Sequence, residues 1–388
     1  MKKNLIFLIV IICCLSILFG CSDGGTVIND TFYERGLTIA DAIFSDFLVP
    51  NVNRFMSYVP EYISGDIDSD LSGTAALWGY GAVMTMTATQ LKINPDDKNL
   101  QKRADFLVDN LEQYRYPRKG RIYSATVGKS EPYYDDNAWV ALAMHDFADT
   151  LENDEYKEIA KGITDYVLSG ESPDGGIFWK ETVSSRNTCS CGPTIIAALR
   201  QYNRSGGQNY LDAAKRIYEW TSSTLRDPAD NVYWDNAELV DGKEVIVESK
   251  FTYNSGTMIT AGVKLYQITG EEQYLEDARN TAEGAHFYFT STHPSGIKYY
   301  PSTPWFNLYL LQGFLSLYEI DKDPQYLESF ETNLERAWEK GRDENGYVQP
   351  SWGCGPVLDE YKYVSLLQES ATAECYALIG GWRLNSGK

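Results

Sequence analysis

The apolar residues of this chain recur with a spacing that predicts paired helices. Five segments, each placed after a polar turn, open a helix with apolar residues at i, i+3 and i+4 spacing. These segments recur roughly every 50 to 65 residues, at 99–104, 155–160, 209–214, 273–278 and 325–330. A weak internal repeat of this period is typical of an architecture built from repeated helical hairpins.

A second and more uniformly apolar helix is expected before each turn. These helices are predicted near residues 74–89, 136–150, 188–201, 255–268, 305–319 and 363–381. A helix that is hydrophobic all round must be buried, so this set is the inner one. An opening helix near residues 33–47 supplies the remaining outer partner. The pattern predicts an all-α fold of six inner and six outer helices, and we infer from the even count that the pairs close into a ring.

The connections from outer to inner helices repeat as well. Each combines a Gly or Asn turn with alternating apolar and aromatic residues, which indicates a short strand or β-hairpin. They lie at 120–123, 176–179, 231–234, 296–299 and 346–349. All should emerge at one end of the barrel and surround its opening with aromatic side chains. No linker rich in Pro or Ser interrupts residues 32–388, which we interpret as a single domain.

The N-terminal segment has the pattern of an export signal. Lys2 and Lys3 precede an apolar run, which ends at Leu18-Phe19-Gly20-Cys21, the form of a bacterial lipobox. This predicts a lipoprotein signal peptide over 1–20, lipidation of Cys21, and a polar tether over 21–31. The expected location is the cell envelope, lipid-anchored at the periplasmic or outer surface. An ordinary signal peptide that happens to contain a cysteine is the alternative.

Composition narrows the class of ligand. A formal charge of -20 argues against binding nucleic acid or anionic lipid through the overall field of the protein. A neutral polymer is a more natural ligand, and an aromatic content of 13% supplies flat rings for stacking on sugars. Four cysteines follow the signal; they are too few for a disulfide framework and are expected to be buried free thiols. No His or Cys spacing resembles a zinc site, so no metal is expected, and a monomer is expected.

Asp135 and Asp136 are the strongest candidates for chemistry. They stand at the start of the second inner helix, where an aspartate can serve simply as a helix cap. Two in tandem repel each other, and burial beside a like charge raises the pKa of one carboxyl group until it can donate a proton near neutral pH. Glycosidic cleavage uses two carboxylates, and a close pair favours a covalent, retaining route. Capping and catalysis both remain open from these residues alone.

Three motifs resemble those of glycoside hydrolase family 76, the endo-α-1,6-mannanases. They are Tyr-Tyr-Asp-Asp-Asn-Ala-Trp at 133–139, Asp-Gly-Gly-Ile-Phe-Trp at 174–179 and Phe-Thr-Tyr-Asn-Ser-Gly at 251–256. The resemblance implies an (α/α)6 barrel and a retaining hydrolase that requires no cofactor. It makes Asp135 the nucleophile and Asp136 the general acid/base. Ser255 stands where the family usually has Gln, so a hydrogen bond to a sugar hydroxyl is expected to be missing or replaced by water.

Further residues are candidates for binding substrate. Each also has a plain structural interpretation: Asn187 as a helix cap, Asp235 as a turn residue, and the tryptophans as core. The candidates are Tyr134, Trp78, Trp179, Asn187, Asp235, Tyr253, Asn254 and Trp305. Trp352 is a further candidate for stacking on sugars, and Glu369 is a reserve carboxylate.

The predicted function is endo-acting cleavage of α-1,6-mannosidic bonds in α-mannan or its manno-oligosaccharides. An unsaturated uronyl hydrolase of the same fold is one alternative, and it would need Arg or Lys beside the starts of the inner helices. The nearest such residues are Arg186 and Lys250. A non-catalytic glycan-binding surface lipoprotein is the other alternative. It would retain aromatic platforms but would have no need for adjacent aspartates.

Overall fold

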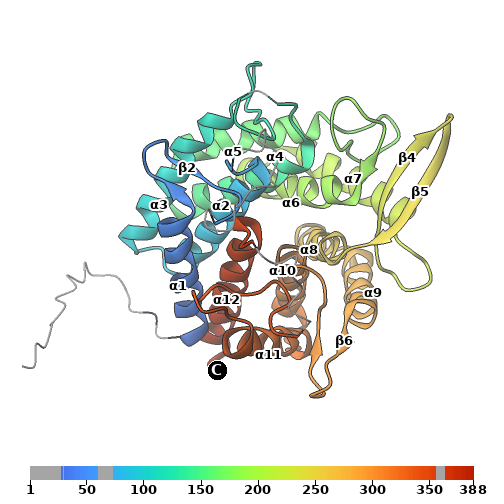
Figure 1. The fold of residues 1–388 in the computed structure, drawn as a ribbon. Coiled ribbons are helices and arrows are strands. Elements are labelled where there is room, and N and C mark those ends of the chain that lie inside the picture. The colour runs from blue at the N-terminus through green and yellow to red at the C-terminus, as the bar shows by residue number, and fades with distance from the viewer. Residues whose placement is uncertain (1–27, 29, 60–72, 129, 355–362) are drawn as a thin grey trace, which may run out of the picture.

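A computed structural model describes residues 28, 30–59, 73–128, 130–354 and 363–388 (Figure 1). Cys21, the signal peptide and most of the tether lie outside the described residues. The helices are α1 (Thr31–Asp46), α2 (Leu77–Ile93), α3 (Lys98–Leu111), α4 (Tyr134–Thr150), α5 (Asp154–Leu168), α6 (Thr188–Ser205), α7 (Gln208–Leu225), α8 (Thr252–Thr269), α9 (Glu272–Phe289), α10 (Pro304–Asp321), α11 (Gln325–Lys340) and α12 (Leu366–Ser386). The strands are β1 (Leu48–Val49), β2 (Arg54–Phe55), β3 (Arg186–Asn187), β4 (Trp234–Val240), β5 (Lys243–Lys250), β6 (Ser291–Thr292) and β7 (Lys298–Tyr299).

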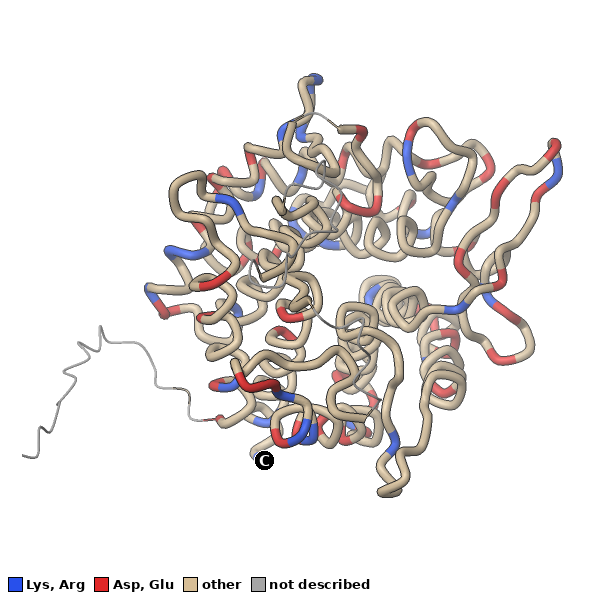
Figure 2. The backbone as a smooth tube through the Cα atoms, viewed as in Figure 1, with Lys and Arg blue, Asp and Glu red and all other residues tan. Residues whose placement is uncertain are grey.

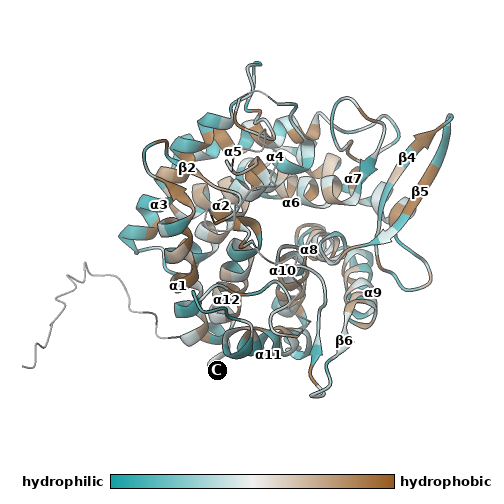
Figure 3. Ribbon diagram, in the orientation of Figure 1, coloured by the Kyte–Doolittle hydropathy of each residue, from teal (hydrophilic) through white to brown (hydrophobic). Residues whose placement is uncertain are grey.

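The even-numbered helices form a closed inner ring. Each packs against the next, and α12 returns to pack against α2 (Figure 1). The odd-numbered helices lie outside this ring and turn one apolar face toward it, as the alternating colours of α3 and α11 illustrate (Figure 3). The predicted (α/α)6 barrel and its ring closure are therefore confirmed.

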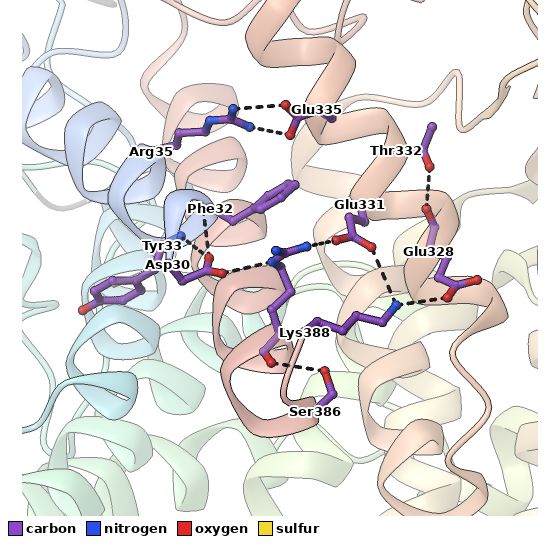
Figure 4. Close-up of polar contacts among 11 residues, drawn as sticks. Asp30, Phe32, Tyr33, Arg35, Glu328, Glu331, Thr332, Glu335, Ser386 and Lys388 are labelled. Atoms are coloured by element: carbon purple, nitrogen blue, oxygen red, sulfur yellow. Dashed lines mark hydrogen bonds and ion pairs between the residues drawn. The ribbon is translucent and has the colours of Figure 1, made fainter. Parts of the chain in front are cut away.

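The two ends of the described domain meet where the ring closes (Figure 4). Asp30 caps α1 by accepting hydrogen bonds from the backbone N–H groups of Phe32 and Tyr33. Its other carboxylate oxygen accepts a hydrogen bond of 3.0 Å from Arg383 of α12, and Arg383 also pairs with Glu331 of α11. Asp30 and Thr31, which the sequence analysis assigned to the tether over 21–31, therefore lie in the folded domain.

The connections from outer to inner helices are held by a repeated contact. In four of them the backbone N–H of a hairpin residue donates to the side chain at the fourth position of the following inner helix. The four pairs are Tyr123 with Asn137, Ile177 with Cys191, Tyr233 with Ser255, and Val348 with Glu369, at donor–acceptor distances of 2.9, 3.2, 3.1 and 3.0 Å. We call these four side chains the mouth anchors. They hold these four connections at the end of the barrel where the inner helices begin.

One element is longer than the short hairpins that the sequence analysis predicted. Strands β4 and β5 form an antiparallel hairpin that projects from the rim of the barrel, at the upper right of Figure 1. Strand β3, which leads into α6, pairs with β4 to make a three-stranded sheet. The other predicted connections are single bridges or, for β6 and β7, a two-residue pairing.

Charged residues lie mainly on the outer helices and the loops (Figure 2). None of the helices in the described part of the chain combines the length and the apolar character needed to cross a bilayer. The cysteines at 189, 191, 354 and 375 are buried and free, as predicted.

Candidate active site

A cleft of about 990 Å³ opens at the end of the barrel where the inner helices begin. Its wall comes from the first turns of α2, α4, α6, α8 and α10 and from the loops that precede them. The residues discussed below that line it are Trp78, Tyr133, Asp135, Asp136, Trp179, Asn187, Cys189, Asp235, Asn236, Glu238, Phe251, Tyr253, Trp305 and Phe306. The cleft therefore collects chain segments that are far apart in the sequence.

Asp135 and Asp136 lie in the first turn of α4 and face this cleft together. Neither occupies the N-cap position, which belongs to Tyr133. Asp135 still accepts a hydrogen bond from the first-turn N–H of Asp136, at a helix end where negative charge is favoured. Capping therefore accounts for part of the role of Asp135 but not for Asp136.

The surroundings of Asp135 supply hydrogen-bond donors to its carboxylate. The indole Nε1–H of Trp179 donates to Asp135 Oδ2 at 3.0 Å, and the Cys189 thiol donates to the same oxygen at 3.6 Å. The backbone N–H of Asp136 donates to Oδ1 at 3.0 Å. Burial raises the pKa of Asp135 to about 6, and these three donors limit the rise.

Asp136 has a different environment. No described residue donates a hydrogen bond to its carboxyl group, and its pKa is raised well above the usual range by burial and by the neighbouring charge of Asp135. Of the two groups, Asp135 is therefore the one stabilised as an anion, and Asp136 is the one that holds a proton. Nucleophilic attack assisted by acid catalysis requires one ionised carboxylate and one protonated carboxyl group.

Aromatic rings form two sides of the cleft. Trp179 packs edge-on against Tyr133, with ring centroids 4.9 Å apart, and Trp78 packs edge-on against Trp305 at the same distance. Trp78 and Trp179 are each 37% exposed, whereas Trp305 is only 2% exposed. The first two can therefore present a ring to a ligand, and Trp305 mainly supports Trp78 from behind.

The loop that carries Trp179 has a steric reason for its two glycines. Gly175 and Gly176 both have positive φ, and a Cβ atom on Gly176 would lie 2.4 Å from the ring of Trp220. A larger residue would push the loop off the outer helix α7 and displace Trp179 from the carboxylate.

Two of the three polar candidates lie in the cleft. Asn187 and Asp235 line it, and burial raises the pKa of Asp235. Asn254 does not line the cleft; it is buried and donates to Asp235 Oδ1 at 3.4 Å. Tyr253 does line the cleft, with its ring stacked on Phe306. Asn254 therefore acts on any ligand only through Asp235.

Four other predicted residues lie away from the cleft. Tyr134 is buried with its ring stacked on Tyr166 of α5, so it is Tyr133 that faces the opening. Trp352 is buried and donates to Thr372. Ser255 and Glu369 are mouth anchors, so the position of Ser255 holds a loop and does not reach a sugar hydroxyl. Glu369 is likewise a structural carboxyl group and not a reserve catalyst.

Several cleft residues were not selected in the sequence analysis. Cys189 was interpreted as a small apolar group, yet its thiol contacts Asp135. Phe251 and Glu238 also line the cleft. The motif at 251–256 contained a signal for the first of these, but nothing local in the sequence marked Cys189 or Glu238.

Trp179→Phe should move the acid limb of the pH profile of kcat/KM to higher pH. The variant keeps a ring but removes the N–H that favours ionised Asp135, so the pKa of Asp135 rises further above about 6. Since protonated Asp135 cannot attack, activity is then lost at a higher pH as the solution is acidified. At neutral pH kcat/KM should fall about tenfold, the usual effect of losing a hydrogen bond to a charged group.

Trp338→Phe is the control for this measurement. Trp338 lies on the outer helix α11 and outside the cleft, so its replacement should leave the pH of the acid limb unchanged. An acid limb in Trp179→Phe that coincides with that of the wild type would contradict the role given to the indole.

The fold and the site together define a class of protein. An (α/α)6 barrel with two coupled carboxylates in an aromatic-lined cleft is the arrangement of a glycoside hydrolase. The family model of glycosyl hydrolase family 76 matches residues 51–347, and the chain belongs to that family.

Solved structures and curated relatives agree with this assignment. A family 76 glycoside hydrolase from a bovine Bacteroides thetaiotaomicron strain is 25% identical, with a TM-score of 0.83 over 92% of this chain and 79% of that one. An inactive variant of an α-1,6-mannanase from Salegentibacter sp. HEL1_6, in complex with α-1,6-mannotriose, is 22% identical, with a TM-score of 0.73 over 90% of this chain and 99% of that one.

Two fungal proteins are similar in sequence. The meiotically up-regulated gene 191 protein of Schizosaccharomyces pombe is 23% identical over 74% of this chain and 70% of its own length. The mannan endo-1,6-alpha-mannosidase DCW1 of Saccharomyces cerevisiae is 22% identical over 43% of this chain and 39% of its own length. The similarity to this second relative therefore covers less than half of either protein.

Proposed function

We propose that this glycoside hydrolase is an endo-acting α-1,6-mannanase that cleaves the backbone of α-mannan with retention of configuration. The observation that carries the proposal is the pair Asp135 and Asp136, which share one cleft but differ in hydrogen-bond donors. The α-1,6-mannanase activity named for the Salegentibacter protein and the endo-1,6-mannosidase activity named for the yeast relative support the choice of substrate.

The first step uses both carboxyl groups. A carboxylate oxygen of Asp135 attacks the anomeric carbon while the glycosidic C–O bond breaks, and the departing oxygen takes the proton of Asp136. The product is a glycosyl ester on Asp135. Neighbouring positions on one helical turn keep the two groups close, which favours this covalent route over direct attack by water.

The second step reverses the roles. Asp136, now ionised, takes a proton from a water molecule whose oxygen attacks the anomeric carbon and releases Asp135. Two attacks from opposite sides of the anomeric carbon retain its configuration. The same side chain thus serves as acid and then as base.

The alternative of a uronyl hydrolase finds no support in the charges of the cleft. Among the described residues that line the cleft there is no Lys or Arg to receive a uronate. Arg186 is buried and pairs with Asp174 and Glu244, and Lys250 pairs with Asp227 and Asp230. Both candidate cations, Arg186 and Lys250, are therefore already paired with carboxylates of the protein.

Product analysis tests the proposal. The protein without its signal segment is incubated with unbranched α-1,6-mannan, and the products are followed by chromatography over time. Early appearance of oligosaccharides of mixed length is the expected result for internal cleavage. Release of a single short product from the start would contradict endo action, and intact polymer that remains bound would favour the glycan-binding alternative.

We also propose that Cys21 is lipidated and anchors the protein at the cell envelope. The support is the Leu18-Phe19-Gly20-Cys21 pattern after an apolar run. Metabolic labelling with a fatty acid should mark the wild type and not Cys21→Ala, and equal labelling of both would overturn the proposal.

A further inference from the structure

The sheet formed by β3, β4 and β5 has one face turned to the cleft. Paired residues stand side by side on the same face of a sheet, and alternate residues along a strand share a face. Asn187 pairs with Asn236, and Asn236 pairs with Val247. One position farther out on the same face, Glu238 pairs with Val245. Since Asn187, Asn236 and Glu238 line the cleft, Val245 and Val247 belong to the cleft side as well.

The outer part of this face is open and carries two valines beside two charged residues, Glu238 and Lys243, the second of which pairs with Val240. Val245 is 42% exposed, and Val240, two residues beyond Glu238 on the same face, is 45% exposed. Glu238 forms no hydrogen bond or ion pair with any other described residue. An apolar strip beside an unpaired carboxylate suits a sugar, which offers C–H groups on its ring faces and hydroxyl donors at its edges.

The opposite face of the hairpin shows how this strip is held in place. Ala237 is buried there, and its partner Ile246 packs against the core. Glu244 pairs with Arg186, whose guanidinium lies over the ring of Trp220. The hairpin is therefore anchored from behind and leaves its cleft-side face free.

We infer that the β4–β5 hairpin extends the cleft and binds mannose units of the polymer beyond those at the carboxylates. The inference rests on the proposed function and deepens it. From Asn236 to Val240 the strand advances about 13 Å, at roughly 3.3 Å for each residue, which is longer than one pyranose ring. Asn236 and Glu238 bind hydroxyl groups at the inner part, and Val245 and Val240 contact ring faces at the outer part.

Val245→Ser and Glu238→Ala test the inference through the dependence of activity on substrate length. For unbranched α-1,6-mannan each variant should raise KM about fivefold, because binding far from the reacting bond is lost. For the shortest manno-oligosaccharide that the wild type cleaves, kcat and KM of Val245→Ser should stay within twofold of the wild-type values, since that substrate does not reach the outer part of the hairpin.

Leu239→Ser is the matched control. Leu239 is 54% exposed on the other face of β4, so the same kind of substitution should leave both substrates unaffected. Thermal melting of all three variants checks that the hairpin is intact.

The outcomes separate the inference from the proposed function. Unchanged KM for mannan in both cleft-side variants, or an equal change for short and long substrates in Val245→Ser, overturns the inference alone. A wild-type protein that cleaves neither substrate overturns the proposed function and this inference with it. An equal effect of Leu239→Ser would mean that the hairpin acts through stability and would also overturn the inference.

Discussion

Asp135→Asn should lose mannan-cleaving activity by about ten-thousand-fold or more, the usual cost of removing a catalytic nucleophile. An amide cannot form the glycosyl ester, and the donors from Trp179 and Cys189 then have no carboxylate to stabilise. The loss should be the same for mannan and for an aryl α-mannoside, because both need attack on the anomeric carbon. Initial rates measured on the two substrates give the comparison.

Asp136→Asn should show a different pattern. Mannan cleavage should fall about a thousand-fold, within the range of general acid catalysis. Formation of the glycosyl ester from an aryl mannoside with a strongly acidic phenol should suffer far less, since that leaving group needs no proton. A burst of phenol followed by slow turnover is the expected time course.

Asp154→Asn is the control for both aspartate variants. Asp154 lies in the first turn of the outer helix α5 and is exposed, and among the described residues its only ion-pair partner is Lys157. Its activity should equal that of the wild type. The assignment of roles fails if Asp135→Asn, and not Asp136→Asn, gives the burst, and the pair is not catalytic if either variant keeps most of its activity on mannan.

Gly256→Ala should lower the free energy of unfolding by about 3 kcal/mol, the cost of forcing an extra methyl group into a closed contact. A Cβ atom on Gly256 would lie 2.2 Å from the carbonyl oxygen of Tyr309, and one on Gly313 would lie 2.6 Å from the carbonyl oxygen of Gly256. Helices α8 and α10 therefore meet backbone to backbone in the inner ring. Because backbone atoms on both sides must move, the ring must open at this point. Denaturant unfolding followed by circular dichroism measures the loss.

Gly79→Ala is the matched control. Gly79 lies in the inner helix α2, but a Cβ atom there would meet its nearest neighbours at 3.9 Å, an ordinary contact. Replacing a helical glycine by alanine where space exists should stabilise the protein by up to about 1 kcal/mol. If both variants unfold at the same denaturant concentration, the close approach of α8 and α10 is not a determinant of stability.

The helices of this barrel could be predicted because each one is marked by the local spacing of its apolar residues. Apolar residues at helical spacing marked α3, α5, α7, α9 and α11, and uniform hydrophobicity marked their inner partners. Ring closure followed from counting pairs. The three motifs placed the aspartate pair on the correct helix turn and at the correct end of the barrel.

Contacts across the ring could not be predicted in this way. Cys189 and Asp135 lie 54 positions apart and meet only because α4 and α6 are neighbours in the closed ring. The choice between Tyr133 and Tyr134 depended on the first residue of α4, and element boundaries are the least certain part of such a prediction. A shift of one residue in that boundary turns the other ring toward the cleft.

The long hairpin had a local signal that the sequence analysis did not use. Asp241 and Gly242 both adopt positive φ and join β4 to β5, and an Asp-Gly pair between alternating apolar residues is a strong hairpin pattern. The helical repeat predicted short connections of equal length. The longer connection between α7 and α8 was therefore not predicted.

The four mouth anchors use an amide, a thiol, a hydroxyl and a carboxyl group for the same task. Each secures the loop that precedes its own helix. Neighbouring loops are also joined to one another, since Tyr133 bridges Lys180 and β3 pairs with β4. A mutation or design that exchanges the loop before α6 must therefore preserve the strand that the loop before α8 pairs with it, so the walls of the cleft are inherited in linked pairs.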